Sequence, residues 1–301
     1  MQPQAQFERI LSICKLFLLA FNSQGNLPHP GLIPACSDIE IIALSLFQSL
    51  LSIESECRFF FSTLRFLLPG FSVKLSRRNF NSRRRRLTQF IEIIRKRLSL
   101  FLCANTGDSL LIIDSMPIET CRYSRASSSR IFKENEDSAP SYGDCAAQQQ
   151  LYWGCKFHCV CTAAGVIGRY DLSPGHHHGI KYLQDIQDEV SNCVLVGDKG
   201  YRSNPLRLTL FEYAGIELAT PCRKNELLQH TMPDDYQRIR KRVEVVFSQL
   251  VDQFAIRKNY AKSQIGLFTR IISKVTLFTM LQYINLMNNK PLSQMRYTLS
   301  A

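Results

Sequence analysis

The sequence predicts an α/β protein, in which a small all-helical domain precedes a domain built on a mixed sheet. Three observations predict this class. Up to about residue 105 the apolar residues recur at helical spacing. Beyond that point, short apolar runs alternate with amphipathic segments, as they do in layered α/β domains. The 301 residues give enough chain for both parts. We therefore expect a helical domain at 1–105, an α/β domain at 106–290 and a tail at 291–301.

The first domain is predicted to consist of several helices. Helical spacing occurs in "FERILSICKLFLLAF" (7–21), "SDIEIIALSLFQSLL" (37–51), "SECRFFFSTLRFLL" (55–68) and "LTQFIEIIRKRLSLFL" (87–102). Lys15 interrupts the first stretch, which also lacks a basic start, so we interpret it as an amphipathic helix and not as an export signal. Ser37 is a good cap for the second, and Pro69-Gly70 ends the third. Short helices around a basic segment resemble a helix-turn-helix-type module.

Most of the positive charge lies in one segment. The formal net charge of the chain is +12, and residues 71–100 hold ten Lys and Arg against one acid, Glu92. Such a block is typical of nucleic-acid binding. The alternatives are a solvated basic face or a patch for anionic membranes, and few large aromatic residues or lipidation signals support the latter. We expect DNA contacts from Arg77, Arg78, Arg83, Arg84, Arg85 and Arg86.

Cysteine usage favours a reducing compartment. The chain has eleven cysteines, an odd number, without a C-x-x-C pair, which favours free thiols in a cytosol. In "YWGCKFHCVCTAAG", strand alternation places Cys155, Cys159 and Cys161 on one face and His158 on the other. We therefore interpret them as buried thiols and not as a zinc site. No uncharged apolar run reaches the roughly 18 residues of a membrane span.

The second domain is predicted from strands and helices in alternation. The expected strands are "DSLLIID" (108–114), a hairpin over 151–174 that turns at Ala164-Gly165, "CVLVGD" (193–198) and "IELATPC" (216–222). The expected helices are "GHHHGIKYLQDIQDEV" (175–190), "SNPLRLTLFEYAG" (203–215) and long helices between 234 and 287. The polar stretch 120–150 is expected to be a loop or insertion.

Three carboxylates stand out by their positions. Asp114 and Asp198 each follow an apolar run, where side chains can converge at one end of a sheet. Glu244 borders the apolar stripe of a helix, one turn after Arg240. It is therefore either a partner of the two aspartates or an ordinary helical salt bridge. Carboxylates are the ligands that Mg²⁺ and Mn²⁺ prefer, and two such ions can catalyse displacement at a phosphodiester.

These acids lie in segments that resemble a known family. "IIDSMPI", "GDKGY" and "RKRVEVVF" resemble the three signatures of DDE transposases from bacterial insertion sequences, with similar separations of 198 − 114 = 84 and 244 − 198 = 46 positions. "YWGCKFH" resembles the family's G-x-K-x-H strand, and "SPGHHHGIKYL" resembles the segment after it. The similarity spans about 108–255 and, more weakly, "FNSRRRRL" in the first domain.

The resemblance implies an RNase H-like core and a transposase function. Asp114 on the first strand, Asp198 at the end of the fourth and Glu244 on a later helix would be the catalytic residues and the ligands of two Mg²⁺ or Mn²⁺ ions. The helical domain would bind terminal inverted repeats, and freed 3′ ends would be joined to target DNA. A homodimer or larger synaptic assembly in a bacterial cytoplasm, at the nucleoid, is implied as well. Phosphate contacts near the active site are expected from Lys199, Arg238, Arg240, Lys241 and Arg242.

Some positions depart from the family pattern and keep alternatives open. Tyr236 stands one residue earlier than the related signature requires, and Val251 stands where a Lys is expected, so Lys258 or Arg257 would have to supply that charge. Gly179 replaces a frequent Asp. The alternatives are a catalytically decayed transposase-like DNA-binding protein and an RNase H-like nuclease without strand transfer. A catalytic His158 is a further possibility. The triplet His176–His178 is typical of a solvated loop.

Overall fold

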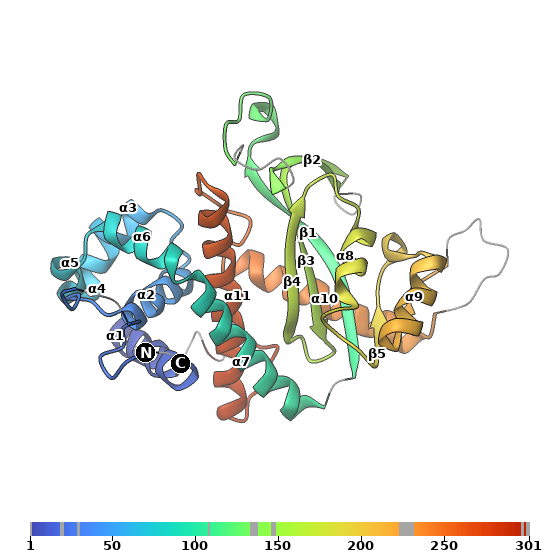
Figure 1. Cartoon of the computed structure of the whole chain (residues 1–301), viewed down its shortest axis with the longest axis horizontal. Helices are drawn as coiled ribbons and strands as arrows, with labels where there is room; N and C mark the ends of the chain where they lie inside the picture. Colours follow the sequence, from blue (N-terminus) through green and yellow to red (C-terminus); the bar gives the residue numbers. More distant parts are fainter. Residues whose placement is uncertain are drawn as a thin grey trace. The chain divides into compact units, whose positions relative to one another are not determined.

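The computed structural model describes residues 2–18, 21–28, 31–107, 109–132, 138–145, 149–222, 232–295 and 298. They form two compact units: unit 1 comprises residues 1–101 and 250–301, and unit 2 comprises residues 102–249 (Figure 1). The sequence groups residues 250–290 with the α/β domain, whereas in the structure they pack with the N-terminal helices. The reason is that the last long helix is apolar on nearly all sides and is buried among those helices.

Unit 1 is helical. Its helices are α1 (Pro3–Phe17), α2 (Asp38–Leu50), α3 (Glu56–Arg58), α4 (Arg65–Leu67), α5 (Pro69–Lys74), α6 (Arg77–Arg86), most of α7 (Thr88–Thr106) and α11 (Gln264–Met287), with a π-helical segment at Phe59–Leu64. The expected cap of α2 is confirmed, because Ser37 and Glu40 form a reciprocal capping box. Pro69 ends one helix and also begins the next, α5.

A buried ion-pair network joins distant segments within unit 1. Glu54 pairs with Lys274 at 2.7 Å, and Glu56 pairs with both Arg84 and Arg270 at 2.7 Å. Burial lowers the pKa of Lys274 to about 8 although Glu54 opposes that shift. These long-range pairs fix α6 and α11 to the start of α3 and the residues just before it.

Unit 2 contains a six-stranded mixed sheet. Its strands are β1 (Leu110–Cys121), β2 (Ser141–Cys145), β3 (Gln150–Thr162), β4 (Ile167–Pro174), β5 (Cys193–Val196) and β6 (Ile216–Ala219). The order is β2-β3-β1-β5-β6, with β4 also paired to β3. The pairs β1/β3, β2/β3 and β3/β4 are antiparallel, whereas β1/β5 and β5/β6 are parallel. The predicted α/β core with a mixed sheet is thereby confirmed.

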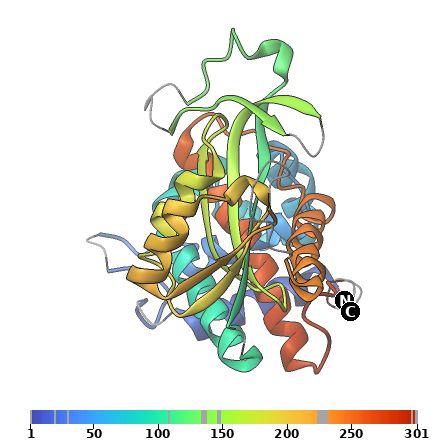
Figure 2. The same ribbon diagram turned by 90° about the vertical axis from the view of Figure 1, so that its right-hand side faces the viewer.

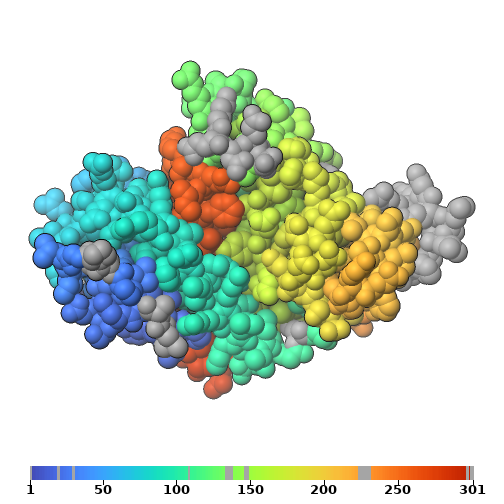
Figure 3. Space-filling model, in the orientation of Figure 1, coloured from blue at the N-terminus to red at the C-terminus, as the bar shows by residue number. Residues whose placement is uncertain are grey.

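Helices cover both faces of this sheet. Helices α8 (Gly179–Ile186) and α9 (Asn204–Ala214) lie on one face, and α10 (Asp234–Asp252) lies on the other (Figure 2). Ile113 and Leu195 pack against the first two helices in one buried cluster. Phe157 of β3 contacts Phe247 of α10, with ring centroids 6.3 Å apart. The space-filling view shows β4, α8 and α9, coloured yellow to gold, on the face of unit 2 toward the viewer (Figure 3).

The structure confirms some local predictions and contradicts others. The hairpin turn at Ala164-Gly165 is confirmed, and Gly165 adopts a φ of +86° that suits glycine. Strand β1 continues to Cys121, so the prediction that it ends at Asp114 is wrong. The stretch 120–150 forms a 3-10 turn at Tyr123–Arg125 and strand β2. Residues 108, 133–137 and 146–148 of the predicted strand and insertion lie outside the described residues.

Two further observations concern thiols and membranes. All eleven cysteines fall within the described ranges, and each is a free thiol. None of the helices that the structure describes combines the length and the apolar character needed to cross a membrane.

Candidate active site

The sheet register brings Asp114 and Asp198 to the same level. The parallel strands β1 and β5 pair through Ile112 and Val196, and each aspartate follows its paired residue by two positions. Because side chains two residues apart share one face of a strand, Asp114 lies on the face opposite Ile113. Ile113 packs toward α8 and α9, so Asp114 faces α10.

Asp114 is an acid held in an unfavourable electrostatic environment. Burial raises the pKa of Asp114 to about 6, and the charges of Asp198 and Glu244 act in the same direction. The backbone N–H of Ser115 donates to Asp114 Oδ1 at 2.7 Å and, with Arg240, opposes the shift. Asp198 and Glu244 therefore both lie within electrostatic range of Asp114.

Asp198 caps a turn and also contributes charge near Asp114. It is the N-cap of the 3-10 turn Lys199–Tyr201 and accepts a hydrogen bond from Gly200 N at 2.9 Å. This explains locally why an acid precedes Lys-Gly. The bond uses Oδ1 of the carboxylate, and Asp198 still contributes charge to the surroundings of Asp114.

Glu244 lies on α10, as the sequence predicts, and its partner is Arg240. The guanidinium of Arg240 donates to Glu244 Oε1 at 2.7 Å and lies 3.9 Å from Asp114 Oδ2. The helical salt bridge left open by the sequence is thus present, and it extends to the aspartate. In the described part of the chain, no three His, Cys, Asp or Glu side chains are arranged to hold a metal ion. Joint coordination by the three acids requires Glu244 to leave Arg240.

The chemistry of these donors fits a hard divalent cation. All three are carboxylates, and their mutual repulsion is the kind that a bound cation relieves. The side chain of Glu244 is 51% exposed and extends from a helix surface, so its rotation disrupts no core packing. Asp114 lies within β1, and Asp198 directly follows the paired strand β5.

Tyr201 lies in the buried cluster that Ile113 forms with residues of α8 and α9, and sequence reasoning did not single it out. It is 2% exposed, and burial together with Asp114 raises its pKa. A side chain at Gly179 would place its Cβ 2.8 Å from a ring carbon of Tyr201. The Tyr201 ring therefore explains why this chain has Gly at position 179, where related segments often carry Asp. The position of Tyr201 three residues after Asp198, within the same turn, could have indicated it.

His158 behaves as a structural residue. Its Nε2 lies 2.8 Å from Ser173 Oγ, and its ring stacks on Tyr182. Burial, the largest cause, lowers the pKa of His158 to about 3, so the imidazole is neutral at physiological pH. It faces the α8 side of the sheet, opposite Asp114. The exposed His176 contacts Ser141 through its ring, and as noted above no metal-binding group occurs in the described residues.

The basic residues near the acids differ in their environments. Lys199, Arg238 and Lys241 are exposed. Arg238 lies 3.8 Å from Asp235. Arg242 is half-buried and donates to the carbonyl of Ala163 at 3.2 Å.

Two of the six arginines expected to contact DNA are buried within unit 1. Arg83 binds Asp38 at 2.6 Å and the carbonyl of Cys36, and Arg84 binds Glu56 at 2.7 Å. Their guanidinium groups face the helical core, so we correct their expected role from phosphate contact to structural pairing. The exposed members of the cluster are Arg77, Arg78, Arg85 and Arg86.

Comparison with known proteins supplies the family. Searches of curated proteins and of solved structures gave no match. Residues 105–280 match the family model described as the transposase DDE domain. The match covers 280 − 105 + 1 = 176 of the 301 residues, more than half of the chain, and it includes Asp114, Asp198 and Glu244. The chain therefore belongs to the transposase DDE domain family.

Proposed function

We propose that this protein is an insertion-sequence transposase. It binds terminal inverted repeats, cleaves DNA at the element ends and joins the 3′ ends to target DNA by two-metal phosphoryl transfer. The observation that carries the proposal is that Asp114 and Asp198 each follow the last paired residues of β1 and β5 by two positions, with Glu244 on α10 in electrostatic range of Asp114. An RNase H-like core is supported by the order β4-β3-β1-β5-β6 within the sheet, three antiparallel strands followed by two parallel ones.

Asp114 and Asp198 would hold the divalent ions, and Glu244 would complete the ligand set. When bound, two Mg²⁺ or Mn²⁺ ions stabilise the attacking and leaving oxygens of an in-line displacement. Asp114 is mostly ionised at neutral pH, because its pKa is about 6, and so offers a charged ligand. Once Glu244 rotates away, Arg240 is available to a phosphate beside the acids.

Each unit would contribute its own basic residues to DNA contact. In unit 1, Arg77, Arg78, Arg85 and Arg86 would contact phosphates of the terminal repeats, and in unit 2 Lys199, Arg238 and Lys241 would contact phosphates near the cleaved bond. Pairing of two element ends requires a homodimer or larger assembly. The working compartment would be the bacterial cytoplasm, at the nucleoid.

The test is cleavage of duplex DNA that carries the element ends, with Mg²⁺ or Mn²⁺. Asp114→Asn, Asp198→Asn and Glu244→Gln should each reduce cleavage at least about a thousandfold, since each removes a charged ligand. DNA affinity should stay within about threefold, because the basic residues that contact phosphates are unchanged in these variants. Glu212→Gln, an exposed acid on α9, is the matched control. Cleavage at the normal rate by any of the three variants contradicts the assignment. Products joined to target DNA separate a transposase from a nuclease.

One observation favours a DNA-binding protein without cleavage. Glu244 is held by Arg240 at 2.7 Å, and no described group is arranged for a metal. A protein fixed in this state would bind end-repeat DNA and fail to bind Mn²⁺. Titration with Mn²⁺ alone therefore separates the two functions before any cleavage assay.

A further inference from the structure

Three aromatic rings form a row at one end of the sheet of unit 2. Tyr123 follows β1, Tyr142 lies on β2 and Trp153 lies on β3. The ring centroids of Tyr123 and Tyr142 are 5.5 Å apart, and those of Tyr142 and Trp153 are 4.7 Å apart, both in edge-to-face geometry. We call these three residues the aromatic row.

The aromatic row is not part of a hydrophobic core. Tyr123 is 47% exposed and Tyr142 is 49% exposed, and the neighbouring Leu151 is 56% exposed. Large apolar side chains that gather on a surface mark interaction sites more often than isolated ones do. Edge-to-face contacts hold the rings in a fixed arrangement, which lowers the entropic cost of binding a ligand between or upon them.

Three arginines belong to the segment that follows β1 and contains Tyr123. Arg122, Arg125 and Arg130 are exposed, and none forms an ion pair with a residue that the structure describes. The described acids at this end are Asp144 and the half-buried Glu119. The exposed rings of Tyr123 and Tyr142, next to exposed guanidinium groups, suit unpaired nucleic-acid strands, because bases stack on the rings and phosphates bind the cations. A purely apolar protein partner would leave these charges uncompensated.

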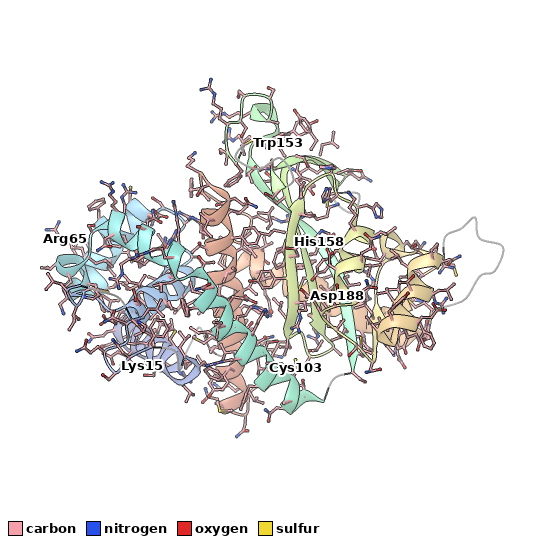
Figure 4. All side chains as sticks on the ribbon, viewed as in Figure 1. Lys15, Arg65, Cys103, Trp153, His158 and Asp188 are labelled. Atoms are coloured by element: carbon pink, nitrogen blue, oxygen red, sulfur yellow. The ribbon has the colours of Figure 1, made fainter. Side chains whose placement is uncertain are left out.

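The aromatic row lies at a defined distance from the candidate active site. Trp153 pairs with Cys121 on β1, whereas Asp114 pairs with Cys159, six positions further along β3. Six residues of a strand span about 20 Å, and nucleotides in one strand of duplex DNA are spaced about 3.4 Å apart. The row is therefore about six nucleotides from Asp114. Figure 4 shows Trp153 at the β2 end of β3 and His158, beside the Asp114 level, nearer its middle.

We propose that the aromatic row binds unpaired bases of the DNA next to the cleavage site by stacking. This inference rests on the proposed function and extends it. It assigns to residues 123, 142 and 153 a contact with single-stranded or locally melted DNA, about six nucleotides from the cleaved phosphodiester. The duplex would then be opened beside the active site, and its displaced bases would be held by rings while Arg122 and Arg125 contact the backbone.

Fluorescence of the full chain tests the proposal, because Trp153 is its single tryptophan. The chain carrying Asp114→Asn, which prevents cleavage, is titrated with a single-stranded oligonucleotide and with its blunt duplex. Saturable quenching is expected with the single strand. Tyr123→Ala with Tyr142→Ala should weaken single-strand binding about tenfold or more and duplex binding less than about twofold, because phosphate contacts dominate the latter. Tyr142→Phe should bind as the parent does, because it keeps the ring.

The controls separate stacking from misfolding and from failure of the proposed function. Tyr213→Ala removes another exposed tyrosine of unit 2, on α9, and should change neither affinity. Circular dichroism should give the same spectrum and melting temperature for all variants. The proposal is overturned by unchanged fluorescence at saturating oligonucleotide, with binding verified by anisotropy of labelled DNA. It is also overturned if the double alanine variant changes self-association and not DNA affinity, which would assign the row to a protein contact. The readout is binding, so a parent chain that fails to cleave DNA would refute the proposed function and leave this test intact.

Discussion

Removing the charge of Arg240 should tighten the binding of a divalent cation in the absence of DNA. In the structure Arg240 neutralises two of the acids that would ligate the metal, with 2.7 Å to Glu244 and 3.9 Å to Asp114. Arg240→Gln removes the positive charge and keeps a side chain of similar polarity. It frees Glu244 for coordination and removes a cation that repels the incoming ion.

The size of the effect follows from the geometry. Two unit charges about 4 Å apart interact by about 1 kcal/mol in water and more in a partly buried site, and the repulsion doubles for a divalent ion. The variant also loses the helical salt bridge between Arg240 and the half-exposed Glu244, which is worth about 0.3–0.5 kcal/mol. The two contributions together predict a gain of about 1–2 kcal/mol, which is roughly a 5- to 30-fold lower dissociation constant at low salt.

Electron paramagnetic resonance of free Mn²⁺ measures this constant directly. Arg240→Lys, which keeps the charge, should bind Mn²⁺ about as weakly as the parent. Arg238→Gln changes an exposed arginine on the same helix and should shift the constant less than about twofold. An Arg240→Gln variant whose affinity is unchanged or weaker would refute the reasoning, because Arg240 would then not compete with the metal for these carboxylates.

Three further predictions follow from other residues. Mn²⁺ affinity should fall as the pH drops below about 6, because the folded-state pKa of Asp114 is raised to about 6 and protons then compete with the ion. Calorimetric titration between about pH 5 and pH 8 should show constant affinity above about pH 6. Glu54→Gln should lower the free energy of unfolding by about 3 kcal/mol, because the 3% exposed Lys274 loses its negatively charged partner at 2.7 Å. Urea unfolding measures this loss, and a value below about 1 kcal/mol, as for an exposed salt bridge, would contradict the prediction. Gly179→Asp should destabilise the fold by about 1–3 kcal/mol, since its Cβ would meet the Tyr201 ring at 2.8 Å; an unchanged melting temperature would show that the ring moves freely.

Local chemistry made part of the fold predictable. The capping box of Ser37 and the turn at Gly165 depend on residues within a few positions of each other, so the sequence contains all that determines them. That Asp114 and Asp198 could converge was also predictable, because each follows an apolar run of the kind that forms a buried strand. The level at which they meet depends on the register of β1 and β5, which the sequence does not specify.

Long-range pairing decided what the sequence did not indicate. Pro117 favours a strand end after Asp114, yet β3 is thirteen residues long and pairs with β1 as far as Cys121. Within the arginine run, Arg83 and Arg84 turn inward to pair with Asp38 and Glu56. These acids lie 45 and 28 positions away in the sequence, so no local pattern reveals the pairing. A run of identical residues gives no means of telling which members face the core.

The pairing of Arg240 with two acids has a physical reason on the proposed function. Three carboxylates close together are unfavourable without a cation. Burial is the main cause of the raised pKa of Asp114, and the charges of Asp198 and Glu244 raise it further. DNA brings further negative charge to the same place, so the acids need a positive partner both before and after it binds. On the proposed function, Arg240 would supply one before binding and would be free for phosphate afterwards, with Asp114, Asp198 and Glu244 left to hold divalent ions. A site organised in this way would be complete only with both metal and DNA bound, which would limit cleavage to bound DNA.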